Sequence, residues 1–84
     1  MYSSDIIKWL VRYNIEYDIS IEYTHVVFNI LEVKDIRIIH SDDNFTFTAI
    51  SINELKFDDV YTEEDLDMII LPYIRARRLT DITS

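Results

Sequence analysis

At 84 residues the chain is long enough for one domain, and its 49% hydrophobic composition supports a packed core. The absence of cysteine excludes disulfides, thiolate zinc sites and cysteine nucleophiles, and the absence of glycine excludes glycine-dependent phosphate loops and nucleophile elbows. The net charge of −8 repels nucleic acid and anionic membranes and attracts basic protein surfaces. We therefore expect a single domain over residues 1–84 that binds neither nucleic acid nor membrane directly.

The first residues do not have the pattern of a secretory signal peptide, because Asp5 falls among them and no small-residue cleavage site follows. The apolar runs are far shorter than the ~20 residues that span a membrane. Both observations predict a cytoplasmic protein, which would lie in the host cytoplasm if the chain is viral.

The first predicted element is a helix that Ser3 or Ser4 caps, with Asp5 in the first turn and Asn14 as its terminator. Its polar side carries Asp5, Lys8 and Arg12. Its broad apolar arc consists of Ile6, Ile7, Trp9, Leu10, Val11 and Tyr13. We expect this arc, Trp9 included, to pack in the core.

A strand follows from Ile15 to Tyr23, where apolar and polar residues alternate. The apolar row comprises Ile15, Tyr17, Ile19, Ile21 and Tyr23, and the polar row comprises Glu16, Asp18, Ser20 and Glu22. This alternation predicts a half-buried strand. The register changes at Thr24 and His25, which indicates a turn or a bulge.

Three further strands are predicted. Val26 to Val33 is apolar on both faces and reads as an interior strand, with a short helix as the alternative. Asp35 to His40 is the next strand, and a turn at Ser41 to Asn44 leads to a strand from Asn44 to Ile52. Asn53 to Tyr61 is irregular or a short extra strand.

A closing helix begins after Thr62, its predicted N-cap, with Asp65 in the position of a capping-box acid. Acids cluster at its start and arginines at its end, which is the arrangement that the helix dipole favours. Pro72 lies ten residues past the cap and predicts a kink or a split into two helices. The fold class is therefore α+β, with the order α-β-β-β-β-α, an antiparallel meander sheet and both terminal helices packed on one face.

Three apolar residues of the closing helix, Met68, Leu71 and Leu79, are expected on the side opposite its inward stripe. A helix in a two-layer domain needs only one apolar face. The second stripe packs under the C-terminal tail or forms an interface between copies, and we favour the interface and a homodimer.

The strongest catalytic candidate is Glu54-Leu55-Lys56 together with Asp43. This order of acid and acid-x-lysine resembles metal-dependent nucleases of the restriction-endonuclease type, in which the carboxylates hold magnesium. The resemblance covers about fifteen residues, and the acidic surface opposes phosphate binding. We therefore expect no catalytic residues, and a turn followed by an exposed strand is the better interpretation of this segment.

Metal ligation by His40 with Asp42 or Asp43, or by His25 with Glu22, lacks the density of ligands that a metal site needs. Both histidines fall at strand ends, where surface or edge positions are expected. A calcium site near Asp58 lacks the loop glycine and the ligand spacing. We expect neither metal nor cofactor.

The remaining feature is the acidic surface. From residue 13 to residue 67 the chain has fourteen acids and three bases. The composition is similar to that of virus- or mobile-element-encoded inhibitors that occupy the nucleic-acid grooves of their targets, and to that of bacteriocin immunity proteins, although no motif supports either resemblance. The expected function is a non-enzymatic inhibitor or adaptor that engages a basic, nucleic-acid-handling protein, with solubility alone as the alternative. The predicted contact residues are Glu16, Asp18, Glu22, Asp42, Asp43, Asp58, Asp59, Glu63 and Glu64.

Overall fold

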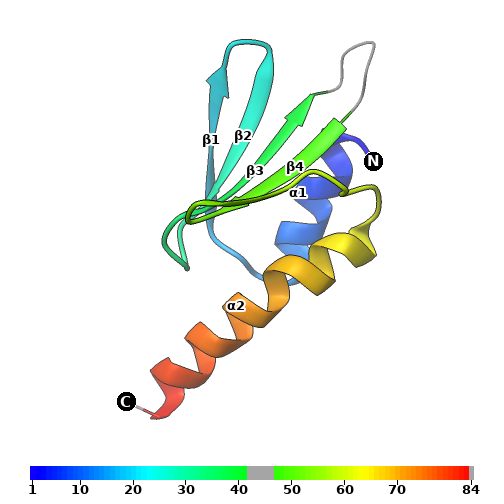
Figure 1. Ribbon diagram of the computed structural model, residues 1–84. Coiled ribbons are helices and arrows are strands. Elements are labelled where there is room, and N and C mark those ends of the chain that lie inside the picture. Colours follow the sequence, from blue (N-terminus) through cyan, green and yellow to red (C-terminus); the bar gives the residue numbers. More distant parts are fainter. Residues whose placement is uncertain (42–46, 84) are drawn as a thin grey trace.

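Two helices and five strands make up the fold in the computed structural model, which describes residues 1–41 and 47–83, with side chains as far as residue 80. The elements are α1 (Ser3–Arg12), β1 (Tyr17–Glu22), β2 (His25–Ile30), β3 (Ile36–Ser41), β4 (Phe47–Ile52), β5 (Leu55–Phe57) and α2 (Glu63–Thr83). The sheet has the order β1-β2-β3-β4-β5, with neighbouring strands antiparallel (Figure 1). The predicted meander between terminal helices is confirmed, and the segment left as irregular or strand contains the short β5.

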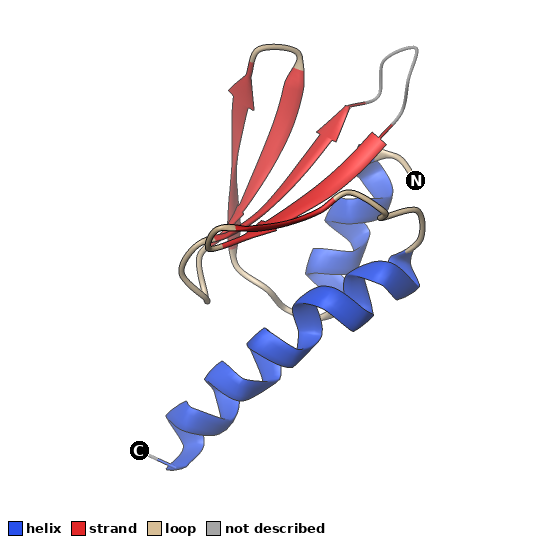
Figure 2. Cartoon of the chain, viewed as in Figure 1, coloured by secondary structure: helices blue, strands red, loops and turns tan. Residues whose placement is uncertain are grey.

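Both helices lie on the same face of the sheet, and the core fills the space between the two layers (Figure 2). Phe28, Ile38 and Ile50 are paired across β2, β3 and β4 and form a fully buried row on this face. Trp9 and Leu10 of α1 belong to the same core. From α2 the core receives Leu66, Ile70, Leu71 and Ile74. Each large aliphatic side chain buried in this way stabilises the fold by about 1.5–3 kcal/mol.

The outermost strand, β1, differs from the sequence prediction. Its apolar row was expected to be buried, but Ile19 is 50% exposed and Ile21 is 75% exposed. The core takes buried residues from β2, β3 and β4, whereas β1 contributes only the half-buried Tyr17. The prediction of a half-buried strand was therefore wrong for the two isoleucines. Alternation reveals that a strand has two different faces, but it does not reveal whether another element covers the apolar one.

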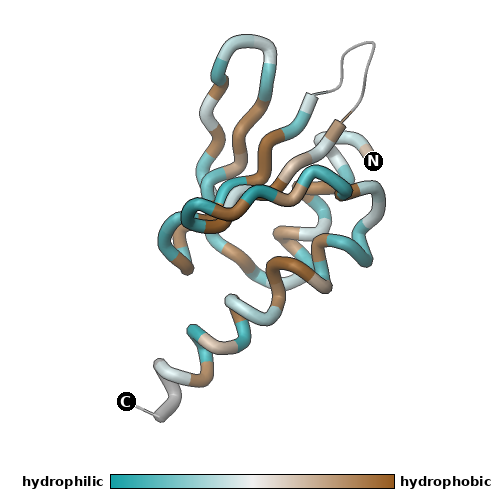
Figure 3. The backbone as a smooth tube through the Cα atoms, viewed as in Figure 1, coloured by the Kyte–Doolittle hydropathy of each residue, from teal (hydrophilic) through white to brown (hydrophobic). Residues whose placement is uncertain are grey.

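The long helix α2 runs through Pro72 as one continuous element, so the predicted split does not occur. Its start is acidic, an apolar stretch follows that packs beneath the sheet, and its second half extends away from the rest of the molecule (Figure 3). The Pro72 side chain is exposed, which keeps the ring out of the core. Neither helix in the described ranges is long and apolar enough to cross a membrane.

Local hydrogen bonds explain where the helices begin. The Asp65 carboxylate accepts hydrogen bonds from the backbone N–H groups of Tyr61 (2.7 Å) and Thr62 (2.9 Å), which confirms the predicted cap of α2. The cap of α1 is Tyr2, one residue earlier than the predicted serines, and its N–H donates to Asp5 at 2.8 Å. A capping carboxylate three residues into the helix thus decides the first turn in both cases.

Among the described residues, four have positive φ: Asn14, Tyr23, Asp35 and Asn53. Asn and Asp tolerate this conformation better than other non-glycine residues, so they take the place of the glycines that the chain lacks. Tyr23 is the exception. It has a φ of 58° in the two-residue turn between β1 and β2, and its side chain is 98% exposed.

Candidate functional site

The first acidic surface follows β1. Asp18 and Glu22 alternate with the exposed isoleucines and lie on the sheet face opposite the helices, with Glu16 immediately before the strand. We call these three residues the β1 acidic row. Asn29 donates a hydrogen bond to Asp18 at 2.9 Å, and Arg37 lies 3.6 Å from Glu22. The strand register places Asp18 and Glu22 on the same face, as predicted, whereas Glu16 lies before the strand and outside the register.

The second acidic surface lies between β5 and the first turn of α2. It consists of Asp58, Asp59, Glu63 and Glu64, which we call the α2-entry acids. Glu63 is half-buried and the other three are exposed. Lys56 lies 3.6 Å from Asp58, and Arg12 lies 3.6 Å from Glu63. These are exposed ion pairs with long distances, and such pairs contribute between 0 and about 1 kcal/mol to stability.

The sheet order separates the two acidic surfaces. β1 and β5 are at opposite edges of the sheet, so four interstrand spacings of about 4.8 Å, roughly 19 Å in total, lie between them. Figure 1 accordingly has β1 and the start of α2 on different sides of the molecule. The single acidic face expected from the sequence is thus two surfaces. Asp42 and Asp43, which were expected to extend it, fall outside the described residues.

Several other acids hold the fold together. Glu32 is in contact with Arg78, which donates to both of its carboxylate oxygens, at 2.7 and 3.1 Å, and these hydrogen bonds raise the pKa of Arg78. Arg78 also donates to the backbone carbonyls of Tyr13 and Asn14, so it joins α2 to the end of α1. Sequence reasoning missed this contact because its partners are far apart in the chain and no local pattern links them.

Asp65 is the acid with the clearest electrostatic signature. The backbone N–H groups of Tyr61 and Thr62 hydrogen-bond its charged form and lower the pKa of its carboxyl group. This shift belongs to the helix cap. It therefore points to a structural role for Asp65 and does not mark a reactive group.

The predicted interface stripe on α2 is only partly exposed. Met68 is 75% exposed and Leu79 is 63% exposed, but Leu71 is 4% exposed and belongs to the core. The expectation that Leu71 lies on the outer side was wrong, because the buried surface of α2 is broad enough to include it beside Ile70 and Ile74. Met68 and Leu79 are eleven residues apart, which places them on one face of the helix, three turns from each other.

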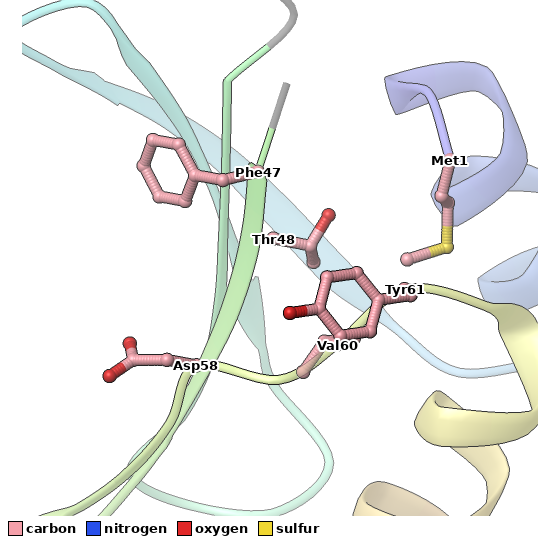
Figure 4. A pocket seen from close by; sticks show the side chains of 6 residues that line it. All are labelled: Met1, Phe47, Thr48, Asp58, Val60 and Tyr61. Carbon is pink, nitrogen blue, oxygen red and sulfur yellow. The ribbon is translucent and has the colours of Figure 1, made fainter. Parts of the chain in front are cut away.

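One shallow pocket, of about 170 Å³, lies beside the second acidic surface. Figure 4 shows the side chain of Phe47, the hydroxyl of Thr48 and the ring of Tyr61 around it, with Asp58 at its margin. Met1 and Val60 complete the lining. Within the described residues this lining has one carboxylate and no histidine, so it offers no paired acid and base for catalysis.

Of the residues in the suggested nuclease site, the structure describes Glu54 and Lys56 but not Asp43, so no complete site can be assembled from the described residues. Glu54 lies in the turn after β4, and Lys56 on β5 is paired with Asp58. Asp43 is outside the described residues, and the strand ends that flank residues 42–46, Ser41 and Phe47, are at the other end of β4 from Glu54. The described geometry gives this alternative no support.

Metal ligation has equally little support. In residues 1–41 and 47–80 no three His, Asp or Glu side chains are grouped as a metal site would require. His40 was expected near the surface, but it is fully buried, with Nδ1 2.8 Å from the hydroxyl of Thr48. His25 packs edge-on against Phe47, with ring centroids 5.0 Å apart.

Comparison with protein-family models, with curated proteins and with solved structures finds no match to this chain. Function is therefore argued from the residues of the chain alone.

Proposed function

We propose that the protein is a cytoplasmic, non-enzymatic inhibitor or adaptor that binds a basic, nucleic-acid-handling partner protein through its acidic surfaces. The observation that carries the proposal is the exposure of acids that lie outside the helix caps and the core. Glu16, Asp18, Glu22, Asp58 and Asp59 are all exposed. By contrast, Asp5 and Asp65 cap helices, and Asp67 hydrogen-bonds Trp9.

Charge spacing along β1 favours a partner that normally binds polyanions. Residues on the same side of a strand recur every ~6.7 Å, about twice the ~3.4 Å phosphate spacing of one DNA strand. The β1 acidic row is therefore a short, fixed array of negative charge. Because Ser20 interrupts the row, its three carboxylates present about a third of the linear charge density of a nucleic-acid strand to a basic groove.

The sign of the charge supports a protein partner. A net charge of −8 raises the association rate with basic surfaces by electrostatic attraction and lowers it with nucleic acid. Exposed aromatic side chains beside each acidic surface, Tyr23 at 98% and Tyr61 at 71%, offer the amphipathic anchors that interfaces favour.

Affinity capture tests the proposal. The native chain, a variant with Asp18→Lys and Glu22→Lys, and a variant with Asp58→Lys and Asp59→Lys are immobilised and exposed to the same cell lysate. We expect the native chain to retain basic nucleic-acid-binding proteins, and at least one variant to lose them as salt rises from ~0.05 to ~0.15 M. Identical capture by all three proteins would refute the proposal and leave the acids as a solubility feature.

A second function, self-association through α2, rests on one observation. Met68 and Leu79 are both exposed on one face of the helix, and the second half of α2 extends away from the sheet. Apolar side chains at this position gain from contact with a second copy of the chain. This role is compatible with partner binding, because neither residue belongs to an acidic surface.

A further inference from the structure

The strand β1 is an open sheet edge. Its only strand neighbour in the described part of the chain is β2, so its other side is unpaired. On the helix side of the sheet this edge carries Ile19 and Ile21, 50% and 75% exposed, and on the other side it carries Asp18 and Glu22. A six-residue edge strand with exposed isoleucines attracts other strands, and proteins usually cover or interrupt such an edge.

The ladder register identifies which backbone groups are available. The N–H of Leu31 donates to the carbonyl of Glu16 at 2.9 Å, so these two residues form a hydrogen-bonded pair. Hydrogen-bonded pairs in an antiparallel ladder recur at every second residue. The backbone groups of Asp18, Ser20 and Glu22 are therefore directed to β2. Those of Tyr17, Ile19 and Ile21 are directed to the open edge.

Pairing of this edge with a second copy of the chain is disfavoured by charge. An antiparallel pair centred on Ile19 places Glu16 opposite Glu22 of the second copy, and a pair centred on Ser20 places Asp18 opposite Glu22. Each register brings like charges together at both ends of the pair, which destabilises it. The acidic row thus disfavours both of these self-pairings and favours a partner strand with basic residues.

We propose that β1 is a docking edge for an extended segment of the partner protein in which lysine or arginine alternates with apolar residues. This inference rests on the proposed function and specifies how the basic partner is held. Added antiparallel to β1, the segment becomes a sixth strand. Its basic side chains lie beside Asp18 and Glu22, and its apolar side chains lie beside Ile19 and Ile21.

The two faces then contribute differently to recognition. Backbone hydrogen bonds to the outward groups of Ile19 and Ile21 hold any extended segment. Opposite-charge pairs across adjacent strands contribute about 0.2–1 kcal/mol each, and the apolar pairs bury the exposed isoleucines. Together the faces select for the alternating basic and apolar pattern.

The turn at the end of this edge supports the assignment. Tyr23 follows the strand in the turn and is almost fully exposed, although its positive φ is unfavourable for a tyrosine. Backbone strain persists where the surrounding structure requires it and concentrates at functional positions. An aromatic side chain kept at this position adds exposed apolar surface at the end of the edge.

In the test, the 84-residue chain is mixed with a synthetic peptide of alternating lysine and valine. Hydrogen exchange of individual amides is then measured by NMR with and without the peptide. We expect the exchange of the Ile19 and Ile21 amides to slow about tenfold or more on binding, because they gain hydrogen-bond partners. N-methylation of the valines should abolish this effect, since valine N–H groups face β1 in the antiparallel pair. N-methylation of the lysines, whose N–H groups face away, should leave it intact.

Three protein variants complete the experiment. Asp18→Asn with Glu22→Gln preserves side-chain shape and should weaken binding of the alternating lysine peptide about tenfold, whereas Asp58→Asn with Asp59→Asn, which removes only long-range attraction, should weaken it far less. Ile19→Pro removes an outward N–H and should abolish docking. If that variant does not fold, the N-methylated peptides still decide the question.

The outcomes separate the two proposals. If a peptide with its lysines in one block binds as tightly as the alternating one, without protection at Ile19 and Ile21, the docking edge is refuted and charge-driven binding stands. If no basic peptide or protein binds with salt dependence, the proposed function itself fails. If the peptide-free chain forms dimers that protect the Ile19 and Ile21 amides, a second copy occupies the edge and the docking proposal is overturned.

Discussion

Trp9 donates its indole N–H to the carboxylate of Asp67 at 2.7 Å, across a sequence separation of 58 residues. The bond joins the middle of α1 to the first half of α2, where both helices meet the core. Trp9 is fully buried, so its N–H needs a partner inside the protein. Asp67 supplies that partner, and this acid therefore belongs to the fold.

Removing this partner should destabilise the protein. Asp67→Ala leaves the buried indole N–H without an acceptor, and we expect the free energy of unfolding to fall by about 1–3 kcal/mol. Asp67→Asn keeps an acceptor and should lose less. Urea unfolding, followed by tryptophan fluorescence, measures both changes. The matched control is Glu64→Ala, an exposed acid of the same helix, which should change stability by less than about 0.5 kcal/mol. Equal effects of the two alanine variants would contradict the role of Asp67.

Local patterns predicted most of the secondary structure. The cap at Thr62 and Asp65 and the alternation along β1 depend on residues close together in sequence, so they can be recognised before the fold is known. The helix dipole likewise explained the acids at the start of α2. The sequence pattern did not reveal the hydrogen bond between Asp67 and Trp9, because that contact depends on how α1 and α2 pack.

The candidate site was harder to predict because it depends on sheet order and coverage. Sequence alternation correctly grouped Asp18 with Glu22, but it did not show that Asp58 lies at the opposite edge. It also placed Ile19 and Ile21 in the interior, since an apolar row is usually buried. Both errors concern which element lies beside another, and in this chain no local residue pattern encodes that.

Stability should fall in acid partly because of Asp65. Its pKa is lowered in the folded state by the N–H groups of Tyr61 and Thr62, so its stabilising contribution is complete above the ordinary aspartate range. That contribution is lost as the pH falls through the lowered pKa. We expect Asp65→Asn to reduce stability at neutral pH and to flatten the decline in acid, measured as melting temperature against pH. Asp59→Asn, which neutralises a nearby exposed carboxylate outside the helix, is the control. An unchanged acid decline in Asp65→Asn would contradict this account.

The positive φ of Tyr23 should lower the stability of the protein. Asparagine tolerates a positive φ better than tyrosine, so Tyr23→Asn should stabilise the chain by about 0.5–1 kcal/mol. Asn53, which also has positive φ, provides the reverse control, and Asn53→Ala should destabilise by about 1 kcal/mol. Urea unfolding compares the variants. A destabilising Tyr23→Asn would show that the tyrosine ring makes a stabilising contact which outweighs its backbone strain.

Self-association, if it occurs through α2, should depend on Met68 and Leu79 and not on Leu71. Met68→Glu with Leu79→Glu places charge on the exposed face, so it should leave the circular dichroism spectrum unchanged and abolish association in sedimentation at micromolar concentration. Leu71→Glu places a charge in the core and should unfold the protein, at a cost of at least about 3 kcal/mol. A native chain that sediments as a monomer at every concentration would refute the interface.

The two acidic surfaces should differ in what they contribute to partner binding. The α2-entry acids lie beside β5, an edge strand of only three residues that offers few backbone groups to a docked segment, so their contribution should be mainly electrostatic attraction. Reversing Asp58 and Asp59 to lysine should therefore slow association several-fold and leave dissociation nearly unchanged. Reversing Asp18 and Glu22 should also accelerate dissociation, because these residues lie beside the exposed isoleucines where a docked strand would be held.

Stopped-flow kinetics with the alternating lysine peptide separates the two rates at low and moderate salt. Added salt should reduce the association rate of the native chain more than that of either reversal variant, because each reversal makes the net charge less negative. If both reversals slow association equally and leave dissociation unchanged, the acidic surfaces act only at long range. Binding would then have to depend on the exposed apolar residues, beginning with Ile19, Ile21 and Tyr23.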